Sequence, residues 1–247
     1  MVVDFLIIGV QKGGTKGATR NLLSHPEIWM PTKEPHFYDK DERWNQGLNW
    51  YSKLIRAKHP PQKHVFGEST PKLIACKKSL LRVKEVVPSA KLIVLLRNPT
   101  DRVISSWQME TRDNIRKKLR CWTLNNRVWN WPKNLTLESW LPPLRRGHYA
   151  EQLQHLYSLF PKEQVHVAIS ERVISNMHQG YNRMVGFLGL DEYKPPSAIA
   201  NQTKKPEPVS VEDWQRINDY YKPYNEQLFE FLGEEIPEWE HSKYSPA

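Results

Sequence analysis

The sequence predicts a three-layer α/β domain in which helices flank a central parallel β-sheet. Short apolar runs alternate with segments of helical periodicity along the 247 residues, which is the pattern of repeated strand–helix units. The residues from 91 to 96, KLIVLL, are apolar on both faces, as expected for a strand inside a parallel sheet. The first apolar run leads through a glycine-rich turn into a helical segment, which is the local arrangement of a P-loop-like fold.

In the N-terminal half, strands are expected where short apolar runs end at turn or polar residues, over 5–9, 65–68 and 91–96. Helical periodicity covers 16–24, 50–55 and 78–87, the last of these stopped by Pro88. The chain after the first helix should stay extended, because it carries Pro26, Pro31 and Pro35. Pro99 is expected to open a helix that runs to about residue 109, since proline is tolerated in the first turn.

In the C-terminal half, a strand at 164–169 is expected between helices at 149–160 and 176–188. A loop over 195–208 should precede a C-terminal helical region at 213–232 that is interrupted near Pro223. The segment around 110–146 is polar and rich in tryptophan and arginine, and we expect it to form a helical or irregular insertion near the substrate. No internal repeat is found, so residues 1–247 are predicted to form a single domain carrying this insertion.

The composition favours acidic ligands. Lysine and arginine number 36 against 27 aspartates and glutamates, which gives a formal net charge of +9. The basic residues are scattered, so nucleic acid is not expected as a partner. Only Cys76 and Cys121 are cysteines, and no disulfide framework is expected. No apolar run approaches the roughly 18 residues that a membrane span needs.

The glycine-rich turn at residues 9–16 predicts a first anion site. Glycines let backbone N–H groups point inward, and the following helix adds positive potential at its N-terminus. Around the paired glycines, Lys12, Thr15 and Lys16 supply side-chain donors. The loop is not a standard Walker A motif, because Thr15 and Lys16 reverse its last pair. A turn without a ligand is the alternative interpretation.

A second anion site is predicted where the strand at 91–96 ends in Arg97. P-loop nucleotide triphosphatases usually carry a magnesium-binding aspartate there, whereas a guanidinium binds phosphate bidentately. Ser105 lies two helical turns further on and could reach the same group. A nucleotide with phosphates at both ends of its ribose would use both sites. The alternative for Arg97 is a surface salt bridge with Asp101.

Glu34 and His36 form a candidate proton-abstracting pair. They lie two residues apart in a segment expected to be extended, so both should face the same side. The carboxylate could take a proton from a hydroxyl while the imidazole orients it. A solvated glutamate beside a surface histidine is the alternative.

Together these stretches resemble one family, the sulfotransferases that use 3′-phosphoadenosine 5′-phosphosulfate (PAPS). The heparan sulfate sulfotransferase-like branch, with its 3-O-sulfotransferases and N-sulfotransferase domains, is the most similar. The residues that carry the resemblance are IIGVQKGGTKGATRNLLSHPEI, KEPHFYD and KLIVLLRNPTDRVISSW, with GLNWY and GESTP between them in the family's order. The similarity runs through most of the chain.

The resemblance implies how the donor is held. The 5′-phosphosulfate would be bound by Lys12, Gly13, Gly14, Thr15 and Lys16. Lys12 would also neutralise the departing phosphate. The 3′-phosphate would be bound by Arg97 and Ser105, and Lys204 or Lys205 would close over the cofactor.

The resemblance also implies the reaction: metal-free, in-line transfer of a sulfuryl group from PAPS to a hydroxyl or amine acceptor, a carbohydrate or a small hydroxylated molecule. Glu34 would be the general base with His36 in support, and 3′-phosphoadenosine 5′-phosphate (PAP) would be the product. Two other functions stay open from the residues alone. One is a P-loop kinase that uses ATP and magnesium on a small molecule, and the other is a non-catalytic module that binds polyanions.

The acceptor is less well defined. By position, the acceptor cleft is expected to be lined by Tyr38, Trp44, Trp50 and His148. The family often has lysine where this chain has Ser69, and Lys72 could replace that basic contact; Asn98 stands where aspartate is more usual. The protein is expected to be cytoplasmic if Met1 is the native start, and to lie in the Golgi lumen if the chain is an excised catalytic domain. The oligomeric state is not predicted.

Overall fold

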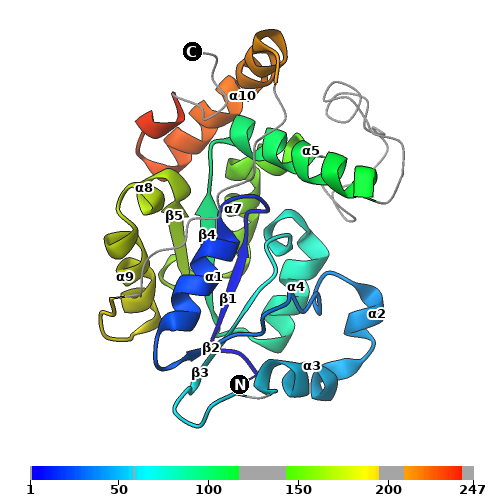
Figure 1. The fold of residues 1–247 in the computed structure, drawn as a ribbon, viewed down its shortest axis with the longest axis vertical. Coiled ribbons are helices and arrows are strands. Elements are labelled where there is room, and N and C mark those ends of the chain that lie inside the picture. The colour runs from blue at the N-terminus through cyan, green and yellow to red at the C-terminus, as the bar shows by residue number, and fades with distance from the viewer. Residues whose placement is uncertain (1, 58, 117–142, 195–208, 241–247) are drawn as a thin grey trace.

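The computed structural model describes residues 2–57, 59–116, 143–194 and 209–240, and these form a five-stranded parallel sheet with helices on both faces (Figure 1). The strand order is β2-β3-β1-β4-β5, and every paired register is parallel. The strands are β1 (Phe5–Gly9), β2 (Ile28–Trp29), β3 (Val65–Ser69), β4 (Lys91–Leu96) and β5 (Val165–Ile169). The predicted fold class, a three-layer P-loop-like α/β fold, is confirmed.

The helices of the described residues connect these strands. They are α1 (Thr15–Ser24), α2 (Asp41–Trp44), α3 (Gly47–Arg56), α4 (Lys77–Val86), α5 (Pro99–Arg116), α7 (Tyr149–Leu159), α8 (Ser170–Ser175), α9 (Met177–Leu188) and α10 (Val211–Leu232). Short 3₁₀ turns occupy Leu73–Ala75, Arg145–Gly147, Lys162–Gln164 and Pro237–Trp239. Helices α8 and α9 lie on one side of the sheet, and α2, α3 and α4 lie on the other (Figure 1).

Alternation along the strands divides the core into two layers. On β1, Leu6 and Ile8 point into a cluster that includes residues of α3, α4, α7 and α10. Their neighbours Phe5 and Ile7 point to the opposite face, into a cluster formed with α1, α8 and α9. Successive side chains of a strand point to opposite faces, and both faces are covered, so the central strands are apolar throughout, as the sequence of residues 91–96 indicated.

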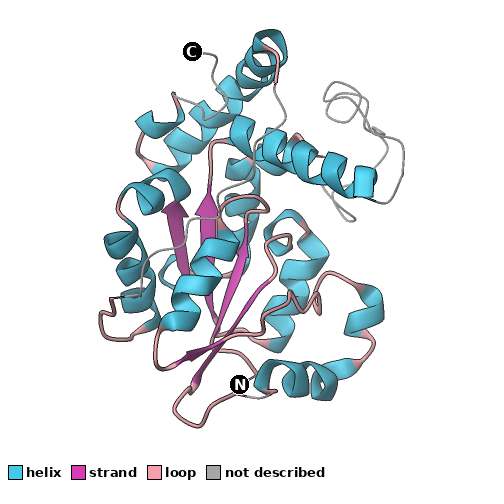
Figure 2. Ribbon diagram, in the orientation of Figure 1, coloured by secondary structure: helices cyan, strands magenta, loops and turns pink. Residues whose placement is uncertain are grey.

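The strand arrows in Figure 2 point towards the end of the molecule where α5 and α10 lie. Val103 and Ile104 of α5 pack there against Trp214, Ile217 and Tyr221 of α10 in a third apolar cluster. This cluster fixes α5 beyond the end of β4, so the carboxyl edge of the sheet is lined by loops that rest on packed helices.

Several expected boundaries were wrong. Strand β2 was not predicted, because two residues carry no periodic pattern, yet Ile28 and Trp29 pair with Val65 and Phe66. Helix α5 continues to Arg116 instead of ending near residue 109, so the expected insertion begins as helix. Helix α10 is continuous through Pro223, although an interior proline costs about 3 kcal/mol. Buried residues on both sides of it, Tyr221 and Leu228, hold α10 in the core.

Candidate active site

A cavity of about 220 Å³ lies at the carboxyl edge of the sheet, beyond β1, β3 and β4. It is lined by Gln11, Lys12, Gly14, Thr15, Lys16, Glu34, Pro71, Lys72, Arg97, Ser105 and Met109. Six of the residues predicted to bind the donor therefore share one cavity with the predicted base: Lys12, Gly14, Thr15, Lys16, Arg97 and Ser105. The sequence did not single out Gln11, Pro71 and Met109, which carry no motif of their own.

The loop between β1 and α1 is shaped by its two adjacent glycines. Gly14 has a φ of 86°, in the left-handed region that favours glycine. A side chain at Gly13 would collide with the Leu95 carbonyl oxygen and with Val10. No side chain caps α1, so the amides of its first turn are available to an anion in the cavity.

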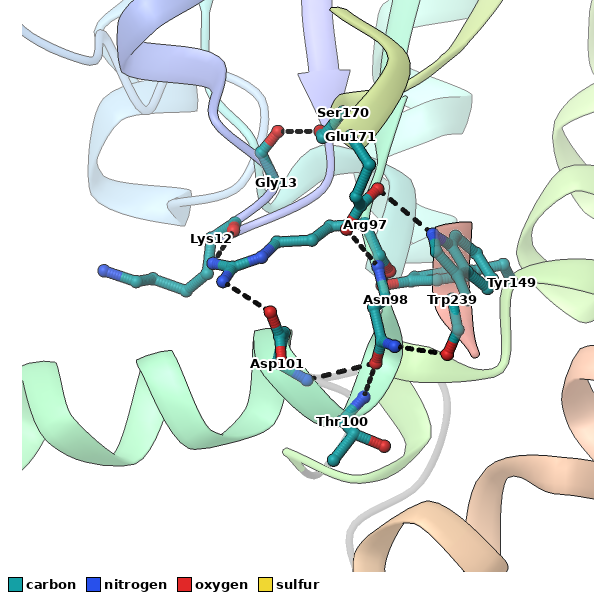
Figure 3. A network of polar contacts seen from close by, with 10 residues as sticks. All are labelled: Lys12, Gly13, Arg97, Asn98, Thr100, Asp101, Tyr149, Ser170, Glu171 and Trp239. Atoms are coloured by element: carbon teal, nitrogen blue, oxygen red, sulfur yellow. Dashed lines mark hydrogen bonds and ion pairs between the residues drawn. The ribbon is translucent and has the colours of Figure 1, made fainter. Parts of the chain in front are cut away.

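Gly13 supports the loop without lining the cavity. Its N–H donates to the Val10 carbonyl at 2.8 Å, and its own carbonyl accepts from the Ser170 hydroxyl at the start of α8 (Figure 3). The loop is thereby fastened both to itself and to the element that follows β5.

The Arg97 side chain joins the two predicted anion sites. One guanidinium nitrogen donates to the Lys12 carbonyl oxygen at 3.1 Å, and the other forms an ion pair with the Asp101 carboxylate, also at 3.1 Å (Figure 3). The salt bridge considered as the alternative is therefore present, and Arg97 lines the cavity as well. The guanidinium is thus held in place at the cavity wall, between the glycine-rich loop and α5.

Glu34, His36 and Asp39 form a polar relay in which the imidazole contacts both carboxylates. The Nε2 atom of His36 lies 3.3 Å from Oε2 of Glu34, and its Nδ1 atom lies 2.9 Å from Oδ2 of Asp39. The Asp39 side chain is 1% exposed, whereas that of Glu34 is 36% exposed. A buried carboxylate thus orients the imidazole, which contacts a carboxylate that remains accessible.

The reason why Glu34 and His36 meet differs from the expected one. The segment is not simply extended, because His36 has a φ of 54°, and this turn brings its ring between the two carboxylates. Asp39 was not predicted as part of the site. Its spacing of three residues from His36 was the available signal, because a base is commonly oriented by a third group.

Lys72 supplies positive charge on the β3 side of the cavity. Burial lowers the pKa of its ammonium, and nearby Arg146 contributes in the same direction, while Asp39 and Glu34 oppose the change. Lys72 therefore lies within electrostatic reach of the relay. This position is compatible with the expectation that Lys72 supplies the basic contact for which the family often has lysine at the position of Ser69.

Two residues predicted to bind the acceptor are buried. Tyr38 has no exposed surface, and its ring packs edge-on against Phe37 and Tyr51. His148 is 5% exposed and stacks on Tyr224 beneath α10. Burial lowers the pKa of His148 to about 4. Neither residue lines the cavity, and the expectation that they face an acceptor is corrected accordingly.

Trp44 and Trp50 lie on α2 and α3, where both pack against Phe37. Through Phe37 they support the segment that carries Glu34, His36 and Asp39, and they do not line the cavity. Lys204, Lys205, Cys121 and most of the predicted insertion lie outside the described residues.

A second cavity of about 330 Å³ adjoins the first and shares Lys16 and Glu34 with it. Its other lining residues are Thr19, Arg20, Leu23, Pro31, Thr32, Lys33 and Ser69. Three of its side chains are cationic, those of Lys16, Arg20 and Lys33, against the single carboxylate of Glu34. This cavity thus suits an anionic molecule placed next to the relay.

Comparison with known proteins identifies the family. The model of the sulfotransferase domain matches residues 3–211. The chain belongs to the sulfotransferase family. Membership supports PAPS as the sulfuryl donor, and neither a kinase nor a non-catalytic binding module is supported.

Curated relatives of this sulfotransferase include human enzymes of heparan sulfate modification. Heparan sulfate glucosamine 3-O-sulfotransferase 5 is 29% identical over 185 residues, which cover 75% of this chain and 53% of the relative. Heparan sulfate glucosamine 3-O-sulfotransferase 3B1 is 27% identical over 257 residues, which cover 94% of this chain and 63% of the relative. The chain thus spans roughly half to three-fifths of the length of these relatives.

Solved structures agree on the fold. A sulfotransferase from Alicyclobacillus acidocaldarius superposes with a TM-score of 0.77 at 21% identity, covering 97% of this chain and 99% of that one. The sulfotransferase domain from the curacin biosynthetic pathway superposes with a TM-score of 0.53 at 14% identity, covering 94% of this chain and 98% of that one. Among the helices that the structure describes in this sulfotransferase, none is long and apolar enough to cross a membrane.

Proposed function

We propose that this sulfotransferase transfers a sulfuryl group from PAPS to a hydroxyl of an anionic carbohydrate of the heparan sulfate type, with Glu34 as general base. The observation that carries the proposal is the position of Glu34, which lines both the cavity with the predicted phosphate ligands and the adjoining basic cavity. A base that activates an acceptor towards a donor must lie where the two molecules meet.

The donor cavity offers positive groups at both ends. Lys12, the amides of α1 and Lys16 would hold the 5′-phosphosulfate, and Arg97 with Ser105 would hold the 3′-phosphate. Either Lys204 or Lys205, in the late loop, would complete this site. Residues 1–247 would form a single catalytic domain.

In the proposed reaction, Glu34 removes the proton from the acceptor hydroxyl while His36 and Asp39 hold its carboxylate in position. The acceptor oxygen forms a bond to sulfur as the bond between sulfur and the 5′-phosphate oxygen breaks. PAP leaves with the extra negative charge on its 5′-phosphate, which Lys12 and the loop amides stabilise. We propose that no metal takes part.

The second cavity supports an acidic acceptor. The side chains of Lys16, Arg20 and Lys33 line this cavity together with Glu34, so its excess positive charge favours an anionic acceptor over a neutral one. The names of the curated relatives point to the same chemistry. Carboxylate or sulfate groups next to the accepting hydroxyl would bind there.

The test is transfer of radiolabel from PAPS to a matched set of glycans, with and without EDTA. Heparan sulfate should accept label, chemically desulfated heparan should accept less, and a neutral glucan should accept none. Label on N-desulfated heparan alone would assign an amine acceptor. Transfer to neutral phenols or sterols in preference to heparan would contradict the proposal, and loss of transfer with EDTA would contradict the metal-free step.

A further inference from the structure

The residue after Arg97 joins the predicted 3′-phosphate site to the C-terminal part of the chain. Asn98 is 2% exposed, and its side chain makes contacts in two directions (Figure 3). Its Oδ1 accepts from the amides of Thr100 and Asp101 at 2.9 and 3.2 Å, which caps the start of α5. Its Nδ2 donates to the carbonyl of Trp239, 2.9 Å away in the turn Pro237–Trp239.

Glu171, on α8, contacts both Asn98 and Trp239, so these three residues form a triangle of hydrogen bonds. Its Oε1 accepts from the Asn98 amide at 3.0 Å, and its Oε2 accepts from the Trp239 indole N–H at 3.1 Å (Figure 3). Asn98 is therefore held through its backbone and its side chain by two segments that are remote from it in sequence. Trp239 itself is 4% exposed and packs on Tyr149.

The triangle adjoins Arg97, the residue that precedes Asn98. The hydroxyl of Tyr149 donates to the Arg97 carbonyl at 2.8 Å, and the Arg97 guanidinium reaches the Lys12 carbonyl at 3.1 Å. The peptide group that follows Arg97 is thus fixed by Tyr149 and Glu171, and the adjoining Asn98 side chain is held by Trp239. A guanidinium can bind phosphate bidentately only when its planar group is correctly aimed.

We propose that Asn98 is a positioning residue for the 3′-phosphate, and that the turn Pro237–Trp239 is the support through which it acts. The inference rests on the proposed function and concerns the same site. The amide side chain accepts from the start of α5 with its oxygen and donates to a carbonyl with its nitrogen, which an ionised carboxylate cannot do. Aspartate, more usual here in the family, caps the helix equally well but places a carboxylate oxygen against the Trp239 carbonyl and beside Glu171.

The experiment compares the affinities of PAP and of adenosine 5′-phosphate, which lacks the 3′-phosphate, by calorimetry. Asn98→Ser keeps a neutral helix cap and loses the donor to Trp239. It should weaken PAP binding roughly tenfold, the typical effect of losing one buried hydrogen bond. Adenosine 5′-phosphate should bind as it does to wild type, because it lacks the phosphate that Arg97 would bind.

Asn98→Asp should weaken PAP binding further, and the additional loss should shrink as salt is raised, because it comes from charge. The part of the loss in PAP affinity that Asn98→Asp has in common with Asn98→Ser comes from the missing hydrogen bond to Trp239, so it should not depend on salt. Asn176→Ser is the matched control: Asn176 also caps a helix, accepting from the Gln179 backbone N–H at 3.1 Å, but it precedes α9. This control should leave both affinities unchanged.

Trp239→Phe offers a second variant, since it keeps the backbone carbonyl and removes the indole N–H that binds Glu171. It should shift the PAP affinity in the same direction and spare adenosine 5′-phosphate. Equal loss for both nucleotides in Asn98→Ser, or no loss for PAP, would overturn the inference. If wild type itself fails to bind PAP, the proposed function fails and the inference falls with it.

Discussion

Glu68 should make the stability of this protein depend on pH in the opposite sense to that of an ordinary paired carboxylate. It lies on β3 with no exposed surface, and among the described residues neither of its carboxyl oxygens has a hydrogen-bond partner. Burial raises its pKa to about 8, and the charges of Asp39 and Glu34 add to the rise, while the hydroxyls of Tyr51 and Thr70 oppose it.

The sign and size of the effect follow from proton linkage. In the unfolded chain Glu68 ionises near its ordinary pKa of 4.5, whereas the folded protein keeps the proton until about pH 8. Between these values the folded state binds one more proton, so the free energy of unfolding falls as pH rises, by about 1.4 kcal/mol per pH unit. The loss should reach about 3 kcal/mol at pH 7 and level off near 5 kcal/mol above pH 8.

Glu68→Gln should remove this dependence, because the amide has nearly the same shape and no proton to lose. Urea unfolding of both proteins from pH 5 to pH 9 measures it. Their free energies of unfolding should nearly agree at pH 5 and should diverge as pH rises, with the variant the more stable. Glu151→Gln is the control, because the Glu151 side chain is 49% exposed and pairs with the exposed Arg145, in a surface ion pair that contributes little to stability.

A constant difference between wild type and Glu68→Gln across this range would refute the reasoning. It would mean that Glu68 is already ionised in the folded protein at pH 5, and that buried hydroxyls or water compensate its charge fully.

Three further variants test the relay and the second cavity. Glu34→Gln should lower the turnover number by about 10²–10⁴-fold with an unchanged calorimetric affinity for PAP; near-normal turnover would remove Glu34 as the base. Asp39→Asn should lower turnover roughly tenfold or more, since it leaves His36 poorly oriented, and a pH–rate profile identical to wild type would contradict this. Lys33→Gln should raise KM for a sulfated glycan several-fold at low salt and leave KM for PAPS unchanged; equal changes in both would argue against a separate acceptor cavity.

The residues that line the cavity as proposed phosphate ligands could be singled out from sequence because each follows a strong local signal. Lys12 lies in a double-glycine turn directly after a buried strand, and Arg97 ends the most apolar strand of the chain. Ser105 follows at a helical spacing within α5. These signals need no knowledge of distant contacts, since a parallel strand that is buried on both faces exposes its next residues only at its end.

The acceptor side could not be predicted in the same way. Tyr38 belongs to an irregular segment, where no periodicity distinguishes an inward from an outward side chain, and its burial is decided by Tyr51 of α3 and by Trp44 of α2. His148 is buried because α10 packs over it from far along the chain. Aromatic residues near a motif are thus weak indicators of a ligand contact until the covering helices are known.

Sheet topology explains why one cavity gathers residues from three separate motifs. The order β2-β3-β1-β4-β5 places β1 between β3 and β4, so the loops that carry Lys12, Lys72 and Arg97 leave the sheet side by side. The segment with Glu34 follows the short strand β2, at the edge beyond β3. It must turn back over β3 to reach the cavity, and the positive φ of His36 with the buried carboxylate of Asp39 fixes that turn. The position of the proposed base Glu34 therefore depends on a loop conformation as well as on strand order, and a substitution that relaxes this turn should reduce turnover before it reduces nucleotide binding.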